Sequence, residues 1–167
     1  MNTSPKILVV DTSIWIDLSN AGLVDSFFML PYTIIVTDFV HSKEYIRFGW
    51  RVLEQKGLRF QGLDPQEVAG LYALSQKRRK ISLVDLAMFI VARKVQGILL
   101  TGDNDLRQLA LQELEVHGFL WVMDEMVSLT ILEPTDAIAL LQSILKLPTT
   151  RLPKSKCEKT IKKWENL

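Results

Sequence analysis

Short apolar runs alternate along the chain with segments of helical periodicity. Four runs rich in Val, Ile and Leu each end at an aspartate: Lys6–Asp11, Thr33–Asp38, Gly97–Asp103 and Phe119–Asp124. Continuous apolarity is typical of strands buried on both faces, the usual condition of parallel strands covered by helices. We therefore predict four buried parallel strands, with Leu58–Gly62 as a weaker candidate for a fifth, edge strand.

The segments between these runs have helical spacing. Helices are expected over Phe39–Lys56, Pro65–Lys77, Leu83–Val95 and Leu106–His117. Strands that alternate with helices in this way indicate βαβ units and an open parallel sheet. The predicted fold class is therefore α/β, with three αβα layers around a central parallel sheet of four to five strands.

The segment Leu83–Val95 is apolar on nearly every side, which predicts a central, buried helix. Ser82 stands at the expected N-cap, and Asp85 follows three residues later in the position of a capping-box acid. Beyond the expected helix from Thr135 to about Lys146, Cys157, Ile161 and Trp164 have i, i+4, i+7 spacing. This stripe predicts a small helix that docks by one apolar face.

The formal charge of +1, from 20 basic and 19 acidic residues, excludes a protein that holds nucleic acid by bulk charge alone. The charge is unevenly distributed, because residues 147–167 contain six basic and two acidic residues. We divide the chain into a main domain, 1–146, and a basic C-terminal tail with a short helix, 147–167. The tail is either part of the same domain or a partner-binding element.

Cysteine content and hydropathy indicate a cytoplasmic location. The single cysteine, Cys157, has no partner for an internal disulfide. The longest apolar stretches are interrupted by Asp or Arg before they reach the roughly 20 residues that a membrane span needs. We expect no membrane association.

Several carboxylates are expected at one edge of the sheet. In an open parallel sheet the working site lies at the carboxyl ends of the strands, where Asp11 ends the first strand and Glu44 follows the second. An aspartate after a strand is commonly only a helix cap, the role we assign to Asp38 and Asp124. Buried carboxylates, however, are costly unless they are paired or bound to a cation. Several oxygen ligands with no Cys and little His indicate Mg²⁺ or Mn²⁺.

A hard divalent cation suits hydrolysis of phosphodiesters, because it lowers the pKa of water and neutralises charge on the phosphate. The chain contains no G-x-S-x-G elbow and no plausible Cys and His pair for nucleophilic catalysis. Metal-assisted hydrolysis is therefore the predicted chemistry.

Four segments resemble those of PIN-domain ribonucleases, including VapC-like prokaryotic PIN proteins. The segments are Val10–Leu18 (VDTSIWIDL), Thr37–Glu44 (TDFVHSKE), Ser82–Ala92 (SLVDLAMFIVA) and Leu100–Leu106 (LTGDNDL). The resemblance spans about residues 6–125, and all four acidic positions of the family are filled.

The resemblance implies a metal-binding catalytic quartet of acids. Its members are Asp11, Glu44, Asp85 and Asp103, with Asp105 as a supporting or alternative ligand. Hydroxyl groups at the same strand and helix ends would support the quartet. They belong to Thr12, Ser13, Ser82 and Thr101, for which caps and turns are an equally good explanation.

The family resemblance implies an endoribonuclease that cleaves RNA. Many small prokaryotic members are toxins of type II toxin–antitoxin pairs, and PIN proteins commonly form homodimers, so an antitoxin protein and a second copy are expected partners. The longer C-terminal ending departs from the compact toxin pattern. The alternative is a catalytically silent PIN-fold module that binds RNA or a protein partner.

Two basic groups are candidates for contact with the RNA backbone. Lys77, Arg78, Arg79 and Lys80 directly precede Ser82, so they are expected near the acids, where cations would offset repulsion of phosphate. A solvated loop between helices explains the run equally well. The lysines of the tail form the second group, for which solvation is slightly favoured.

Overall fold

The protein forms a five-stranded parallel sheet in the computed structural model, which describes residues 5–40 and 49–167. The strands are β1 (Ile7–Val10), β2 (Thr33–Thr37), β3 (Arg59–Gln61), β4 (Ile98–Leu100) and β5 (Val116–His117). Their order is β3-β2-β1-β4-β5, and every neighbouring pair is parallel. The predicted α/β fold is confirmed, and the weak candidate near Leu58–Gly62 is the edge strand β3.

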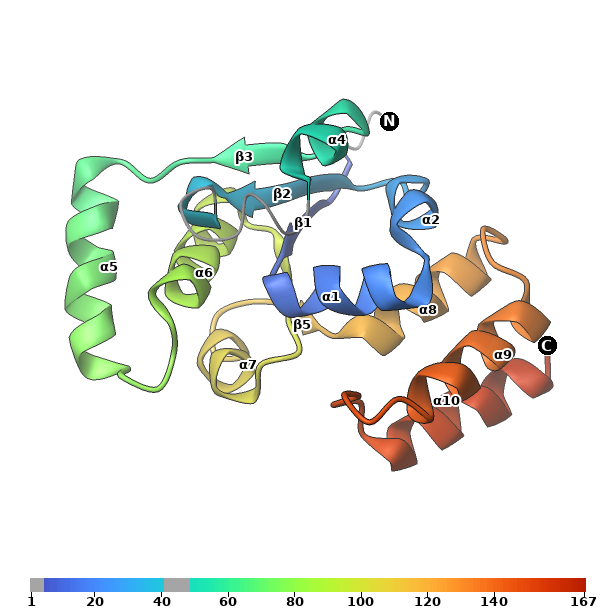
Figure 1. Cartoon of the computed structure of the whole chain (residues 1–167). Coiled ribbons are helices and arrows are strands. Elements are labelled where there is room, and N and C mark those ends of the chain that lie inside the picture. Colours follow the sequence, from blue (N-terminus) through green and yellow to red (C-terminus); the bar gives the residue numbers. More distant parts are fainter. Residues whose placement is uncertain (1–4, 41–48) are drawn as a thin grey trace.

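Helices cover both faces of this sheet (Figure 1). They are α1 (Thr12–Ala21), α2 (Val24–Phe28), the 3-10 turn η1 (Asp38–Val40), α4 (Trp50–Gln55), α5 (Pro65–Lys77), α6 (Leu83–Val95), α7 (Asn104–Ala110), α8 (Phe119–Ser128), α9 (Pro134–Leu145) and α10 (Lys154–Glu165). Helix α6 packs on β1, β2 and β4 and is flanked by α5 and α7, whereas α1, α2 and α8 pack together and carry α9 and α10 outside them. None of the helices in the described part of the chain is long and apolar enough to cross a membrane.

Helix α6 is the central helix that its apolar sequence predicts. Every residue from Leu86 to Ala92 is buried. The Ser82 hydroxyl accepts a hydrogen bond from the backbone N–H of Asp85 at 3.1 Å, which satisfies a donor at the helix start. Arg93 and Lys94 in the last turn complement the negative end of the helix dipole.

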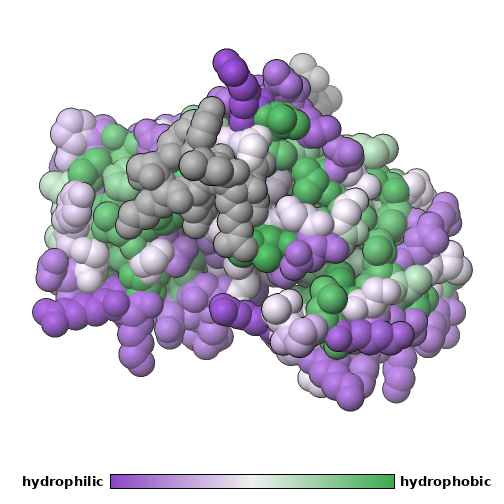
Figure 2. Space-filling model, viewed as in Figure 1, coloured by the Kyte–Doolittle hydropathy of each residue, from purple (hydrophilic) through white to green (hydrophobic). Residues whose placement is uncertain are grey.

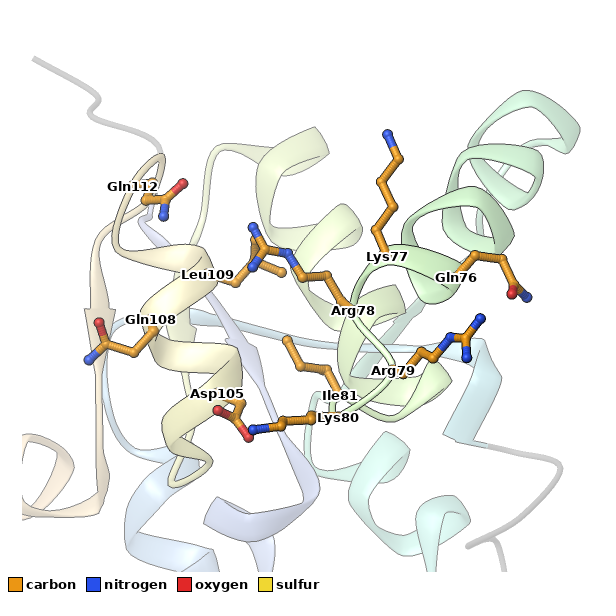
Figure 3. A pocket seen from close by; sticks show the side chains of 10 residues that line it. All are labelled: Gln76, Lys77, Arg78, Arg79, Lys80, Ile81, Asp105, Gln108, Leu109 and Gln112. Atoms are coloured by element: carbon orange, nitrogen blue, oxygen red, sulfur yellow. The ribbon is translucent and has the colours of Figure 1, made fainter.

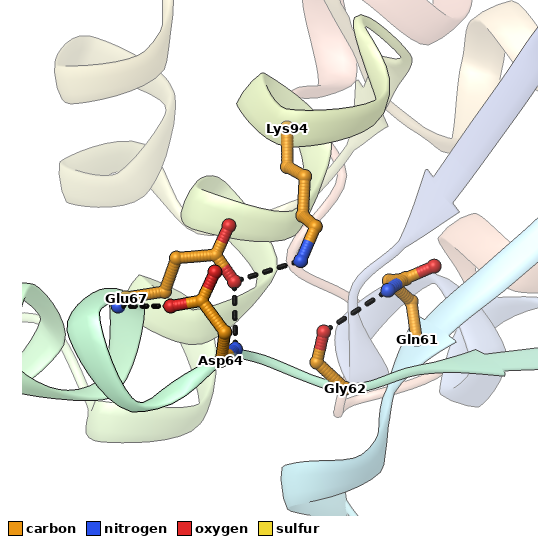
Figure 4. Close-up of polar contacts among 5 residues, drawn as sticks. All are labelled: Gln61, Gly62, Asp64, Glu67 and Lys94. Carbon is orange, nitrogen blue, oxygen red and sulfur yellow. Dashed lines mark hydrogen bonds and ion pairs between the residues drawn. The ribbon is translucent and has the colours of Figure 1, made fainter.

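Polar contacts at the N-terminal end of α5 fix this helix to α6 (Figure 4). Asp64 Oδ1 accepts from the N–H of Glu67, and Glu67 Oε2 accepts from the N–H of Asp64, both at 2.8 Å. The same Glu67 oxygen accepts from Lys94 Nζ at 2.8 Å. Because α5 and α6 form a helical hairpin, this anchor leaves the basic residues from Lys77 onward next to the start of α6.

Two expectations about the second half of the chain are wrong. Residues Phe119–Asp124 form the first part of helix α8 instead of a strand, because buried residues continue at helical spacing through Met126 and Val127. The helix expected over Leu106–His117 ends at Ala110, and the last two residues of that range form β5, which pairs with β4.

Asp124 connects α8 to the C-terminal helix and is not a cap. Its carboxylate accepts from Lys163 Nζ at 2.8 and 2.6 Å and from Trp164 Nε1 at 2.9 Å. Cys157 and Trp164 are buried and Ile161 is partly buried, as the i, i+4, i+7 stripe predicts. Helix α10 therefore docks on α8 and α9 through both apolar and charged contacts.

Replacing Asp124 by Ala should loosen α10. The buried indole N–H of Trp164 would lose its acceptor, which costs about 1–3 kcal/mol. Amide hydrogen exchange should become faster in residues 154–165 and remain unchanged in the central sheet. Glu158→Ala, which removes an exposed carboxylate from α10 itself, is the control and should leave exchange unaltered. Equal protection of α10 in both variants would contradict this role of Asp124.

Candidate active site

The candidate site lies where the strand order reverses. The chain places β2 and β3 on one side of β1, and β4 and β5 on the other. Asp11 directly follows β1, and Thr101 directly follows β4. Open parallel sheets bind ligands at this point, outside the carboxyl ends of the strands.

Asp11 is held by two hydroxyl groups. The carboxylate is 3% exposed, and its Oδ2 accepts from Ser13 Oγ at 2.8 Å and from Thr101 Oγ1 at 2.7 Å. Each hydroxyl in turn accepts from a backbone N–H, Ser13 from Gly102 at 2.9 Å and Thr101 from Asp103 at 3.0 Å. Because each hydroxyl oxygen accepts a backbone N–H, its own proton points at Asp11. The network joins the ends of β1 and β4.

Gly102 leaves room for this network. A Cβ at this position would lie 3.2 Å from Ser13 Oγ, closer than ordinary van der Waals contact. The absence of a side chain therefore lets the backbone N–H of residue 102 approach the hydroxyl that holds Asp11.

Asp85 lies beside Asp11 in the first turn of α6 and is partly buried. Burial first, and then repulsion by the Asp85 carboxylate, raises the pKa of Asp11 from its ordinary 3.8 to about 7. The hydrogen bonds from Thr101 and Ser13 stabilise the carboxylate and offset part of this shift. Asp11, which is buried, and Asp85, which is partly buried, thus form a pair of neighbouring acids at the sheet edge.

The other predicted acids are placed differently. Asp103 is exposed, and its Oδ1 accepts from the N–H of Leu106 at 2.7 Å, so it caps α7. Asp105 is exposed on the first turn of α7. Glu44 lies outside the described residues. Across residues 5–40 and 49–167, no three acids gather as a complete metal-binding group; the structure brings together Asp11 and Asp85.

The predicted supporting residues Ser13 and Thr101 contact Asp11, and Ser82 caps the helix of Asp85. Thr12 is the first residue of α1, directly after Asp11. The structure adds Arg107, whose Nη2 donates to the carbonyl oxygen of Thr101 at 2.8 Å. In the sequence, Arg107 stands four residues after Asp103, on the short helix that Asp103 caps, and this spacing is the signal that could have pointed to it.

The predicted RNA-contacting residues Lys77, Arg78, Arg79 and Lys80 are all exposed. They line an open pocket of about 660 Å³ between the α5–α6 connection and α7 (Figure 3). Asp105 lines the same pocket from α7. The pocket thus adjoins the first turns of α6, which Ser82 caps, and of α7, which Asp103 caps.

A family model of the PIN domain matches the chain over residues 7–166. The chain belongs to the PIN domain family. No curated protein matches it. The match extends through α9 and nearly all of α10, and it supports a nuclease-type fold.

PIN domains typically use divalent metals, and the described acids suit such a cation in their chemistry. Asp11 and Asp85 offer oxygen atoms alone, the ligands that hard cations prefer. Two neighbouring carboxylates repel each other unless a proton or a cation compensates their charge. The pair of Asp11 and Asp85 is therefore the part of the site that fits a metal ion.

Replacing Asp11 by Asn should stabilise the metal-free protein more at pH 8 than at pH 4. Asp11 is protonated in both states below its unfolded pKa of 3.8, and its folded pKa is about 7. The favourable contribution of Asp11 to the free energy of unfolding therefore falls by about 2–4 kcal/mol in total as the pH rises from 3.8 to about 7. Urea unfolding in EDTA at several pH values measures the difference.

Asp17 is the internal control, because it is present in both the wild-type protein and the variant. Burial raises the pKa of Asp17 to about 6, so it lowers the stability of both proteins equally as the pH rises. Stability curves that stay parallel from pH 4 to pH 8 would show that Asp11 ionises normally in the folded state.

Proposed function

We propose that this PIN domain is a divalent-metal-dependent endoribonuclease that hydrolyses phosphodiester bonds of RNA. The observation that carries the proposal is the pairing of buried Asp11 with partly buried Asp85 at the strand-order reversal. Two neighbouring acids of this kind destabilise the fold unless a proton or a cation compensates their charge. A site that binds Mg²⁺ or Mn²⁺ accounts for this cost, whereas a purely structural role does not.

The proposed ligands are Asp11, Glu44, Asp85 and Asp103. A bound divalent cation supplies neutralisation of charge on the scissile phosphate and a lower pKa for the attacking water. Asp105 is left out of this set, because in Figure 3 its side chain extends toward Lys80.

The residues around the acids have positioning roles in this proposal. Ser13 and Thr101 both donate to Oδ2 of Asp11 and leave its Oδ1 for Asp85 or for a cation. Arg107 holds the carbonyl of Thr101 and so fixes the turn that follows β4. One of the acids orients the attacking water, and the nearby basic run offsets repulsion between the acids and the RNA backbone.

Changing either Asp11 or Asp85 to its amide should abolish cleavage. Asp11→Asn and Asp85→Asn each remove a charged ligand while keeping the side-chain size. We expect cleavage of single-stranded RNA with Mn²⁺ to fall below about a hundredth of the wild-type rate. The far-UV circular dichroism spectrum should be unchanged, and EDTA should stop cleavage by the wild-type protein.

Asp38→Asn is the matched control. It removes the same charge at the carboxyl edge, from an exposed aspartate that follows β2, and should preserve cleavage. Cleavage that survives both EDTA and the substitutions Asp11→Asn and Asp85→Asn would refute the proposal. RNA binding without cleavage at millimolar Mn²⁺ would instead support the silent PIN-fold module.

The toxin role in a type II pair rests on the family resemblance and extends the proposal to the cell. It implies a cytoplasmic homodimer that an antitoxin protein neutralises. Induced expression of the wild-type chain in a bacterial host should arrest growth, and expression of Asp11→Asn at the same level should not. Equal growth of the two cultures would argue for a nuclease that is not a toxin.

A further inference from the structure

The open pocket beside the acids has the composition of a nucleotide-binding site. Lys80 is two residues before the α6 cap Ser82, and Asp105 is two residues after Asp103. Two residues of chain span at most about 7 Å. The pocket, at about 660 Å³, lies within the range of roughly 300–1,000 Å³ that small ligands occupy.

The lining of the pocket combines three kinds of group. Four cations, Lys77, Arg78, Arg79 and Lys80, line the pocket from the connection between α5 and α6. Ile81 and Leu109, each 8% exposed, supply apolar surface. Gln108 and Gln112 add amide groups from the α7 side. A nucleotide needs these same three partners for its phosphate, the face of its base and the edge of its base.

The four cations do not point in the same direction. In Figure 3 Arg78 and Lys80 extend from the connection toward α7, whereas Lys77 points upward beside α5 and Arg79 points away from α7. Among the described residues none of the four forms an ion pair. Arg78 and Lys80 are therefore the two cations placed to act across the pocket.

We propose that this pocket binds one nucleotide of single-stranded RNA next to the bond that is cleaved. Arg78 and Lys80 contact phosphate, the base lies against Ile81 and Leu109, and amide groups of the α7 side contact its edge. Single-stranded RNA is specified because its bases can leave the stack and lie on apolar or guanidinium surfaces. The inference deepens the proposed function and rests on it for the identity of the substrate.

Asp105 has a defined role in this pocket. Its carboxylate lies opposite Lys80 and repels phosphate. Asp105→Asn should therefore tighten RNA binding measured in EDTA. Unchanged or weaker RNA binding by this variant would contradict the role.

The test compares four single substitutions that each remove one positive charge. Binding of the wild-type protein to a labelled single-stranded RNA 12-mer is measured in EDTA over a range of salt concentrations, so that cleavage does not interfere. Arg78→Ala and Lys80→Ala should each weaken binding about tenfold and reduce the salt slope by about one. Lys77→Ala and Arg79→Ala are the matched controls and should weaken it less than about threefold.

A second pair of variants tests contact with the base. Gln108→Ala combined with Gln112→Ala should change the relative affinities for oligo(A), oligo(U) and oligo(C), with the salt slope unchanged. A duplex of the same length should bind more weakly than the single strand.

Equal losses for all four charge substitutions, or equal affinity for duplex and single strand, would overturn the inference and leave bulk charge as the explanation. Because binding is measured without metal, this result is separate from cleavage. Asp11→Asn can still cleave RNA while the Arg78 and Lys80 substitutions weaken binding more than the two controls do. In that case the proposed metal mechanism fails and the proposed RNA pocket is supported.

Discussion

The hydrogen bonds from Thr101 and Ser13 to Asp11 are the interaction on which the candidate site depends. The bond from Thr101 joins residues that are 90 positions apart along the chain and connects the ends of two neighbouring central strands. Without them a carboxylate that is 3% exposed would have lost its hydration with little in return. The sheet supplies the position of Asp11, and the hydroxyl groups make that position tolerable.

The same region separates opposite charges over a short distance. The acids Asp11 and Asp85 are at least partly buried at the sheet edge, whereas the cations Arg78 and Lys80 are exposed on the connection between α5 and α6. The anchor through Glu67 and Lys94 joins α5 to α6 at the opposite end of the two helices. A nearly neutral chain can thus present adjacent sites for a cation and for a phosphate, which an even distribution of charge would not provide.

Local patterns in the sequence predicted most of the fold. Pro65–Lys77 and Leu83–Val95 are helices with the predicted bounds, because their caps and apolar faces are encoded within each segment. The assignment of Phe119–Asp124 failed because a short apolar run does not distinguish a buried strand from the first turns of a buried helix. The pairing of Asp11 with Thr101 depends on strand order, and the link of Asp124 to Trp164 depends on helix packing, so neither could be read from spacing.

The missing side chain of Gly102 has an evolutionary consequence. Because a Cβ there would lie 3.2 Å from Ser13 Oγ, positions 13 and 102 form one steric unit although they are distant in sequence. A lineage that acquired a larger residue at position 102 would have to give up the hydroxyl at position 13 or move the turn after β4. Substitutions at the two positions should therefore be correlated among related chains, with glycine retained wherever the serine is retained.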